Sequence, residues 1–303
     1  LDFRGSGTTF SVVRLRHAYL NLDWGTSALL LGQTWHPLYG DVAPQILNLN
    51  MGAPFQPFSR APQIRYRYKT GDIQITGAAL WQSQYLSQGP EGKSQKYIKN
   101  SCVPEIYAGI DYKHKGLLIG AGIEMVSLTP RTQATVEDKI YKVSERITSL
   151  SYEVHMKYNS EKWLVAAKSV LGSNLTQTSM LGGYGIKSID PRTGEQEYSP
   201  NRNSSSWINI VYGKTWKPAI FFGYMKNLGT SDAVTNMYGT GTNVDQLLSG
   251  TAELTYNVPH WKLGVEYNLT SAWYGSLNHS NGKVVDTHSV SNNRLVATAL
   301  FMF

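Results

Sequence analysis

The amino-acid sequence predicts an all-β chain that forms an antiparallel transmembrane β-barrel, and three observations lead to this fold class. Segments of roughly ten residues alternate between apolar and polar side chains along most of the 303 residues. Tyrosine and tryptophan gather beside tight turns, and short turns alternate with long polar loops. In a barrel that crosses a bilayer, one face of each strand meets lipid and the other meets the interior, which produces this alternation.

The hydropathy agrees with strands rather than helices as the spanning elements. Mean hydropathy is -0.29, because lipid-facing and interior-facing residues cancel in any window. No run of residues approaches the ~18 consecutive apolar positions that a membrane helix requires. Helical spans are therefore excluded, and we expect one barrel domain over residues 1–303.

The alternation predicts thirteen strands. The clearest one places Ile64, Tyr66 and Tyr68 on one face and polar or basic residues on the other. The predicted strands cover residues 13–24, 28–36, 63–70, 73–86, 104–113, 117–128, 146–158, 162–172, 205–214, 218–228, 249–258, 261–274 and 292–303. An earlier strand that ends at Phe3 would give fourteen, and sixteen would need one more hairpin before Leu1. Both counts are even, as in single-chain bacterial barrels.

The positions of the aromatic residues and the lengths of the connections favour a membrane barrel over a soluble β-sandwich. The aromatic residues beside turns are Trp24, Tyr68, Tyr112, Tyr158, Trp163, Tyr212, Trp216, Tyr256 and Trp261. Short turns at 25–27, 70–72, 114–116, 159–161, 215–217 and 259–260 alternate with long loops at 39–62, 87–103, 128–145, 174–204, 230–247 and 277–290. A sandwich would scatter its aromatics through a core, whereas a barrel places them in interfacial girdles and has short turns on one side only.

The end of the chain predicts the orientation. The last strand alternates and closes on Phe303, which resembles the assembly signal of outer-membrane β-barrels. We therefore expect a bacterial outer-membrane location, with the C-terminus and the short turns on the periplasmic side. Because no signal peptide precedes Leu1, we expect a processed chain or a fragment.

The charge and cysteine content narrow the partners. The net charge is +7 and the isoelectric point is near 9.2, yet the basic residues are spread singly along strands, with no Lys/Arg-rich run. This distribution predicts no nucleic-acid partner and is compatible with anionic solutes. The single cysteine, Cys102, excludes an intramolecular disulfide, and we interpret it as a loop thiol without a role.

Three stretches resemble the DcaP-like porins, especially those of Bacteroidetes. They are residues 14–24 (RLRHAYLNLDW), 31–35 (LGQTW) and 52–65 (GAPFQPFSRAPQIR). The specific match covers roughly residues 13–68, and the remainder agrees only in pattern. The resemblance implies a homotrimer of sixteen-stranded barrels, of which this chain would lack the first two strands and most of the third. It also implies that the loop at 39–62 folds into the lumen and narrows the channel; fourteen strands is the alternative.

The predicted lumen is lined by charges of both signs. Loop 39–62 is apolar for an exposed loop, so we expect it to pack inside the barrel, with packing over a neighbouring protomer as the alternative. A basic ladder on the lumen face follows it, and a β-bulge near His17 would add two more arginines to that wall. The expected pore-lining residues are Arg14, Arg16, Asp41, Arg60, Arg65, Arg67, Lys69, Glu124, Glu153 and Glu266, and Glu253 also faces inward. Guanidinium rows favour anions, and acids on the opposite wall moderate this, so we predict a modest anion preference.

The predicted function is passive diffusion of small anionic or neutral hydrophilic solutes. The expected partners are outer-membrane lipid, lipopolysaccharide and further copies in a homotrimer. The alternatives are a surface-displayed binding or structural barrel with a plugged lumen and, less favoured, an outer-membrane hydrolase. His155 near Glu153 is interpreted as lumen lining, and Asp245 is a poor signal for calcium. The sequence contains no His/Cys zinc cluster and no phosphate-cradling glycine loop, so we expect no enzyme activity, no cofactor and no metal.

Overall fold

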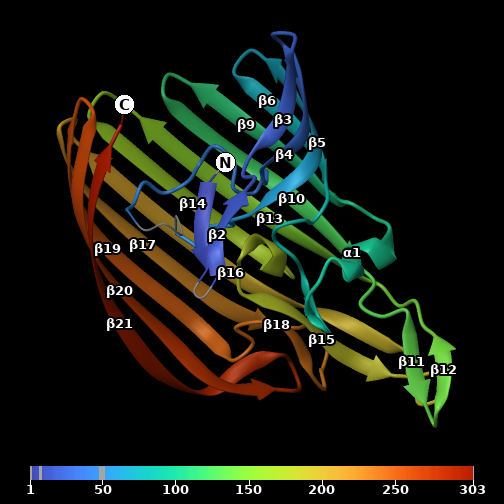
Figure 1. The fold of residues 1–303 in the computed structure, drawn as a ribbon. Helices are drawn as coiled ribbons and strands as arrows, with labels where there is room; N and C mark the ends of the chain where they lie inside the picture. Colours follow the sequence, from blue (N-terminus) through green and yellow to red (C-terminus); the bar gives the residue numbers. More distant parts are fainter. Residues whose placement is uncertain (1, 7–8, 48–51, 303) are drawn as a thin grey trace.

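The chain folds around one large antiparallel sheet. The structure is a computed structural model that describes residues 2–6, 9–47 and 52–302, with side chains from Leu15 onward. The sheet contains 15 strands, and Figure 1 shows it as a strongly curved wall. Neighbours along its main path are β3 (Ala18–Asp23), β4 (Ser27–Trp35), β5 (Arg60–Thr70), β6 (Ile73–Leu80), β9 (Glu105–His114), β10 (Leu117–Leu128), β13 (Ile147–Asn159), β14 (Trp163–Ser173), β16 (Gln196–Tyr212), β17 (Trp216–Gly229), β19 (Val244–Val258), β20 (Trp261–Asn278) and β21 (Lys283–Phe301).

Each of the thirteen predicted strands has one counterpart on this path. The all-β antiparallel fold class is therefore confirmed. Within the described residues no ladder joins β3 to β21, so fourteen or sixteen strands in a closed barrel stays a prediction. The predicted features at Leu1 and Phe303 lie outside the described residues.

Several predicted boundaries were wrong. β6 ends at Leu80 rather than at residue 86, β16 begins at Gln196 rather than at residue 205, and β19 begins at Val244 rather than at residue 249. The strand predicted at 13–24 begins only at Ala18, because residues up to Arg14 belong to β2 (Thr9–Arg14), which pairs with β1 (Asp2–Ser6) in a separate two-stranded sheet. Phe3, which was expected to end an earlier strand of the barrel, lies within β1 instead. The long loop predicted at 277–290 is instead a hairpin tip, since β20 continues to Asn278 and β21 begins at Lys283. Its ladder runs on through the pair Leu277 and Val284. The register shifts between Tyr274 and Ser276, and apolar and polar residues do not alternate regularly there, so the pattern gave no signal of the strands.

The connections at the two ends of the sheet differ in length and content. Short turns join consecutive strands at one end, which we call the turn end, and the C-terminus lies there (Figure 1). The other end, the loop end, carries additional elements: β7 (Gln88–Gly89), β8 (Gly92–Lys93), α1 (Lys96–Ser101), β11 (Gln133–Val136), β12 (Lys139–Lys142), η1 (Thr176–Thr178), β15 (Gly182–Ile189) and β18 (Met237–Thr240). No helix in the described part of the chain has the length and apolar character needed to cross a membrane.

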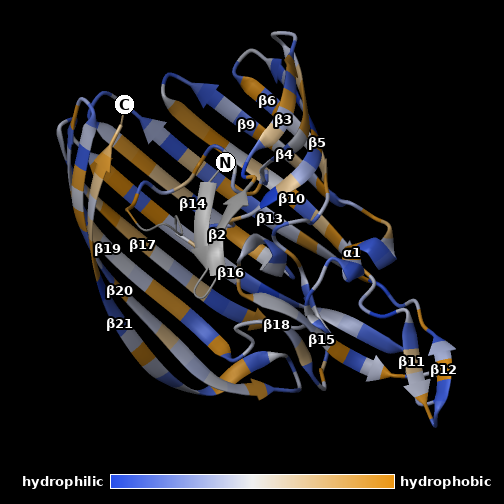
Figure 2. Ribbon diagram, viewed as in Figure 1, coloured by the Kyte–Doolittle hydropathy of each residue, from blue (hydrophilic) through white to orange (hydrophobic). Residues whose placement is uncertain are grey.

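The two faces of the sheet have opposite character. On β5 the apolar side chains of Ile64 and Tyr66 are 59% and 48% exposed, whereas the alternating Gln63 and Arg65 are 5% and 8% exposed. Figure 2 shows the resulting bands of hydrophobic and hydrophilic colour along the strands. We call the face of Gln63 and Arg65 the inner face and the opposite one the outer face. Apolar groups outside and polar groups inside are typical of a membrane barrel.

Apolar packing on the inner face occurs in two places. Near the loop end, α1 and the segment after β14 pack against the wall through residues such as Tyr97, Leu128 and Tyr184. Farther along the sheet, Val42 and Phe55 pack against Trp207 and Phe221 of β16 and β17. The second cluster belongs to the connection between β4 and β5, so this connection lies over the inner face.

Candidate functional site

The connection from His36 to Ser59, here called loop 36–59, is held by side chains of distant strands. The buried ammonium of Lys168 on β14 donates to the carbonyl oxygens of Leu38 and Tyr39, at 2.6 and 3.0 Å. Farther along, the Gln45 N–H donates to Asn209 Oδ1 on β16 at 2.7 Å. These contacts carry the loop across the inner face, from its own strands toward the opposite part of the wall.

The far end of the loop reaches two glutamates that face each other across neighbouring strands. The Leu47 N–H donates to Oε2 of both Glu253 and Glu266, at 2.8 Å each, and these two residues are direct register partners on β19 and β20. Residues 48–51 lie outside the described part. Both acids therefore accept from the loop backbone, and Glu266 is only 1% exposed.

The returning half of the loop is packed as well as hydrogen-bonded. Trp207 Nε1 donates to Gln56 Oε1 at 2.8 Å, and the ring centroids of Phe55 and Phe221 are 6.2 Å apart. Phe55 also lies directly over Gly223, where an added Cβ would be 2.6 Å from the Phe55 ring. The glycine thus makes room for the loop, because any larger residue would displace the aromatic side chain.

The start of the loop is fixed by a buried cluster of His36, Glu105 and Glu124. Nε2 of His36 lies 3.2 Å from Glu105 Oε2 and 3.3 Å from Glu124 Oε1, and all three side chains are at most 1% exposed. Their ligand atoms lie within 4.8 Å of one another, a spacing that could hold a metal ion.

A further contact at this cluster favours hydrogen bonding over metal binding. The Leu38 N–H donates to Nδ1 of His36 at 3.2 Å, so the proton of a neutral ring lies on Nε2 and points toward the carboxylates. A metal-bound histidine instead donates through its other ring nitrogen. We therefore interpret the cluster as an anchor that ties the first residue of loop 36–59 to β9 and β10.

A small hollow separates the start of the loop from the basic wall. Its volume is about 40 Å³, and its lining includes Asp41 from the loop, Arg65 and Arg67 from β5, Asp111 from β9 and His155 from β13. We call it the eyelet. It is large enough for water or a small ion, and every charged side chain around it is positioned by a strand or by the anchored loop.

The charges around the eyelet differ in how far they are already paired. Lys113 Nζ lies 3.0 Å from Asp41 Oδ2. Partial burial alone would raise the pKa of Asp41, but Lys113 and the guanidiniums of Arg67 and Arg65 outweigh it and hold this pKa below its usual value. Asp41 is therefore ionised at neutral pH.

Of the two arginines, Arg67 is the one with an available guanidinium. Arg65 is buried, and its Nε donates to Gln63 Oε1 at 2.8 Å while its Nη2 donates to the Trp35 carbonyl. Arg67 is half-buried, and no hydrogen bond or ion pair connects its side chain to the part of the chain that the structure describes. A solute in the eyelet would meet the Arg67 guanidinium without having to displace a protein partner.

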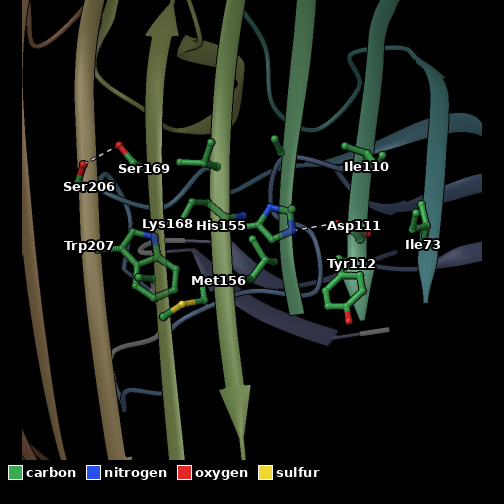
Figure 3. A pocket seen from close by; sticks show the side chains of 15 residues that line it. Ile73, Ile110, Asp111, Tyr112, His155, Met156, Lys168, Ser169, Ser206 and Trp207 are labelled. Atoms are coloured by element: carbon green, nitrogen blue, oxygen red, sulfur yellow. Dashed lines mark hydrogen bonds and ion pairs between the residues drawn. The ribbon is translucent and has the colours of Figure 1, made fainter. Parts of the chain in front are cut away.

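In the lining of the eyelet, His155 is held between two carboxylates. Nδ1 lies 2.9 Å from Glu153 Oε2 and Nε2 lies 2.9 Å from Asp111 Oδ1; Figure 3 shows the contact with Asp111. The Tyr107 hydroxyl donates to Glu153 Oε1 at 3.1 Å. Both ring nitrogens are engaged, and no serine or cysteine is among these partners, so the arrangement lacks the nucleophile of a hydrolytic triad.

The structure places the other predicted pore-lining residues in different surroundings. Lys69 is exposed on the inner face near the turn end, and Arg16 is half-buried in the segment between β2 and β3. The Arg14 side chain lies outside the described part. Arg60 is 2% exposed and stacks on Trp35, with its guanidinium carbon 4.1 Å from the ring centroid.

The predicted acidic residues lie in the wall. Glu124 and Glu153 are at most 2% exposed, and they sit on β10 and β13 rather than opposite the basic ladder, close enough to pair with His36 and His155. The sequence did not identify Lys113 and Lys168 as partners of the loop, or His36 as the residue that anchors its start. Alternation places Lys113 on the inner face of β9, together with Asp111. Nothing in the sequence shows that Asp41 of the loop would contact it.

A larger hollow lies on the other side of the wall. It measures about 750 Å³ and includes the exposed side chains Ile110, Ile119 and Val154 of the outer face. Figure 3 shows this region, where Ser169 and Ser206 bond to each other at 2.8 Å. Because its outward side chains are mostly apolar, this hollow suits lipid or another protein surface better than a hydrophilic solute.

Comparison with solved structures shows the same architecture in outer-membrane proteins. OmpT of Vibrio cholerae, expressed in the outer membrane, is similar at a TM-score of 0.57 and 10% identity, over 95% of this chain and 81% of that one. The trimer form of in-vitro folded OmpT from Vibrio cholerae gives 0.54 and 11%, over 98% and 82%. OmpF of Salmonella typhi, in complex with daunomycin, gives 0.51 and 13%, over 95% and 79%.

The sequence itself gives no relative in these comparisons. No protein-family model matches the chain, and no curated protein matches it in sequence. At identities of 10–13% the structural likeness shows the fold alone. The chain therefore has the fold of outer-membrane β-barrels, and the resemblance to DcaP-like porins stays a prediction.

Proposed function

We propose that the protein is a porin of the bacterial outer membrane, a water-filled channel for small hydrophilic solutes with a modest preference for anions. The observation that carries the proposal is loop 36–59, which crosses the inner face and leaves the unpaired guanidinium of Arg67 at a narrow place. A rigid loop inside a barrel sets the pore size, and fixed charges beside it set the ion preference.

The balance of charge around the eyelet supports the preference for anions. Arg65, Arg67 and Lys113 surround Asp41, and the Lys157 ammonium lies 3.4 Å from the Asp41 carbonyl oxygen. Four cationic groups thus face Asp41 and one further carboxylate, Asp111. The buried acids that were expected to moderate the field are paired with histidines or with the loop backbone, so they present little charge to a solute.

The proposed assembly is a homotrimer in outer-membrane lipid and lipopolysaccharide, with the short turns and the C-terminus on the periplasmic side. The exposed apolar outer face and the girdle of aromatic residues at the turn end support a lipid environment. The trimer form of the structurally similar OmpT is a precedent for the assembly. Sixteen strands and a DcaP-like affiliation belong to the same proposal.

The experiment is reconstitution of the purified protein in planar bilayers under a KCl gradient. The expected result is discrete conductance steps with a reversal potential of the sign that chloride preference gives. A reversal potential of the opposite sign would overturn the anion preference.

A second candidate is a barrel whose lumen is plugged. The anchors of loop 36–59 extend from Lys113 on β9 to Glu266 on β20, so the loop covers much of the inner face. The folded state is checked by the change in electrophoretic mobility that boiling produces in a β-barrel. Folded protein that gives no conductance steps would favour this candidate over the channel.

A further inference from the structure

A pair of neighbouring residues, one aromatic and one lysine, recurs at the turn end of the sheet. The pairs are Tyr68-Lys69, Tyr112-Lys113, Lys157-Tyr158, Lys162-Trp163, Trp216-Lys217 and Trp261-Lys262. Each lies within a few residues of a short turn, on β5, β9, β13, β14, β17 and β20 or directly beside them. The aromatic members belong to the interfacial girdle that the sequence predicts, and each has a lysine as its neighbour in the chain.

The two members of each pair point to opposite faces, because successive side chains of a strand do so. The aromatic members are exposed on the outer face; Trp163 and Trp216, for example, are 48% and 59% exposed. Five of the lysines share the face of the buried inner residues of their own strands, such as Arg65 for Lys69 and Glu266 for Lys262. A collar of lysines therefore surrounds the inner side of the turn end, at the height of the aromatic girdle.

Two lysines of this collar, Lys157 and Lys217, converge on one hollow with Lys162 from the turn before β14. Its volume is about 200 Å³, and it is lined by Lys157, Lys162 and Lys217 together with Asn159 and, from loop 36–59 above it, Gln45. The ammonium groups of Lys162 and Lys217 have no hydrogen bond or ion pair with the described residues, and that of Lys157 contacts only the Asp41 carbonyl oxygen. The charges are thus available to a ligand.

One acid also borders this hollow, but its charge is already compensated. Glu161 forms an ion pair with Lys214 in the neighbouring turn. The hollow therefore keeps an excess of three positive charges beside amide groups that can donate hydrogen bonds.

We propose that this hollow is a binding site for small polyvalent anions, such as inorganic pyrophosphate, that enter from the turn end. Ammonium groups act as mobile point charges and bind phosphate oxygens without a fixed geometry. Several of them within one hollow favour a ligand with two or more negative charges over a monovalent one, since the attraction grows with ligand charge. Lys157 and Lys217 lie on the inner face of their strands. Gln45 of loop 36–59 borders the same hollow, which Trp163 of the girdle also lines, so the ligand is a solute in the lumen rather than a lipid headgroup.

The first test measures binding directly and does not depend on conduction. Detergent-solubilised protein is titrated with pyrophosphate by calorimetry, with chloride at constant ionic strength. The variant combines Lys162→Gln with Lys217→Gln, and the control combines Lys139→Gln with Lys142→Gln, which remove the same charge from the β11–β12 hairpin at the loop end. The variant is expected to bind about tenfold more weakly, at roughly threefold per lysine, and the control is expected to bind like the parent.

The second test, which rests on the proposed channel function, measures sidedness. In a bilayer that holds the protein in one orientation, pyrophosphate on the turn side is expected to reduce the chloride current at lower concentration than pyrophosphate on the loop side. The lysine variant should lose this asymmetry. The site is overturned if the variant binds pyrophosphate as tightly as the parent and the control do. It is also overturned if pyrophosphate blocks the current equally from both sides. Absence of conduction with normal binding overturns the channel only.

Discussion

Arg67 offers the sharpest perturbation of the proposed selectivity. Its guanidinium lines the eyelet without a partner in the described chain, so Arg67→Gln removes one charge and breaks no contact of the fold. A unit charge about 5 Å from a permeating ion contributes about 0.8 kcal/mol in water, and screening at 0.1 M salt reduces this to about 0.5 kcal/mol.

The effect on selectivity is twice this energy, because the charge attracts anions and repels cations. A difference of about 1 kcal/mol lowers the anion-to-cation permeability ratio by about fivefold. Arg67→Glu doubles the change in charge and should invert the preference. The assay is the reversal potential under a KCl gradient, with single-channel conductance recorded in parallel to show that the pore size is unchanged.

Arg192→Gln is the matched control, since Arg192 lies in an exposed turn at the loop end and loses the same charge. Its reversal potential should equal that of the parent. If Arg67→Gln shifts the reversal potential no more than Arg192→Gln does, while the parent stays anion-selective, the eyelet charges do not set the preference and the reasoning fails.

Two other predictions concern loop 36–59, and a third concerns the aromatic girdle. Asp41→Asn should raise the anion-to-cation ratio by about the same fivefold factor, measured as a reversal potential, because it removes the ionised loop carboxylate. Gly223→Val should change the single-channel conductance or its noise, since the new Cβ would push Phe55 and its loop off β17; Gly250→Val, which meets nothing within 4 Å, should leave the conductance as it is. Trp163→Ala should lower the unfolding free energy in lipid vesicles by about 1 kcal/mol, because it removes a girdle ring and its aromatic contact; an unchanged urea midpoint would contradict the interfacial role of this ring.

The strands and short turns could be predicted because their signal is local. Alternation over a few residues assigned Ile64 and Tyr66 to the outer face and Arg65 to the inner face, and their exposed fractions agree. The aromatic girdle was also visible, and Trp163 pairs with Tyr212 across neighbouring strands at 4.6 Å between ring centroids.

The candidate site could be predicted only in part, because its contacts join residues far apart in the chain. Leu47 binds Glu253 and Glu266, more than 200 residues later, and no spacing in the sequence marks such a pair. Arg60 was expected beside the opening, yet it stacks on Trp35. This contact depends on the path of the chain after β4, which the local sequence pattern does not specify. The sequence of a strand thus predicts the charge of a side chain and the face on which it lies, but not the residue that it contacts.

The pairs of aromatic and lysine residues explain why the turn end was predictable and the loop end was not. A slip of one residue in register would exchange the faces of every side chain in a strand. At the turn end it would place Lys69 and Lys113 against lipid and their tyrosines inside. In β5 it would also turn Arg65 outward, at a cost of ~2–4 kcal/mol if this depth is near the midplane. Beyond Trp273 on β20 the register shifts between Tyr274 and Ser276, and the few apolar residues, such as Leu277, no longer form a regular stripe, so alternation carries little information there. The alternation of apolar and polar side chains fixes the register of the sheet in the membrane. Where this alternation ends, the sequence alone no longer predicts the strands.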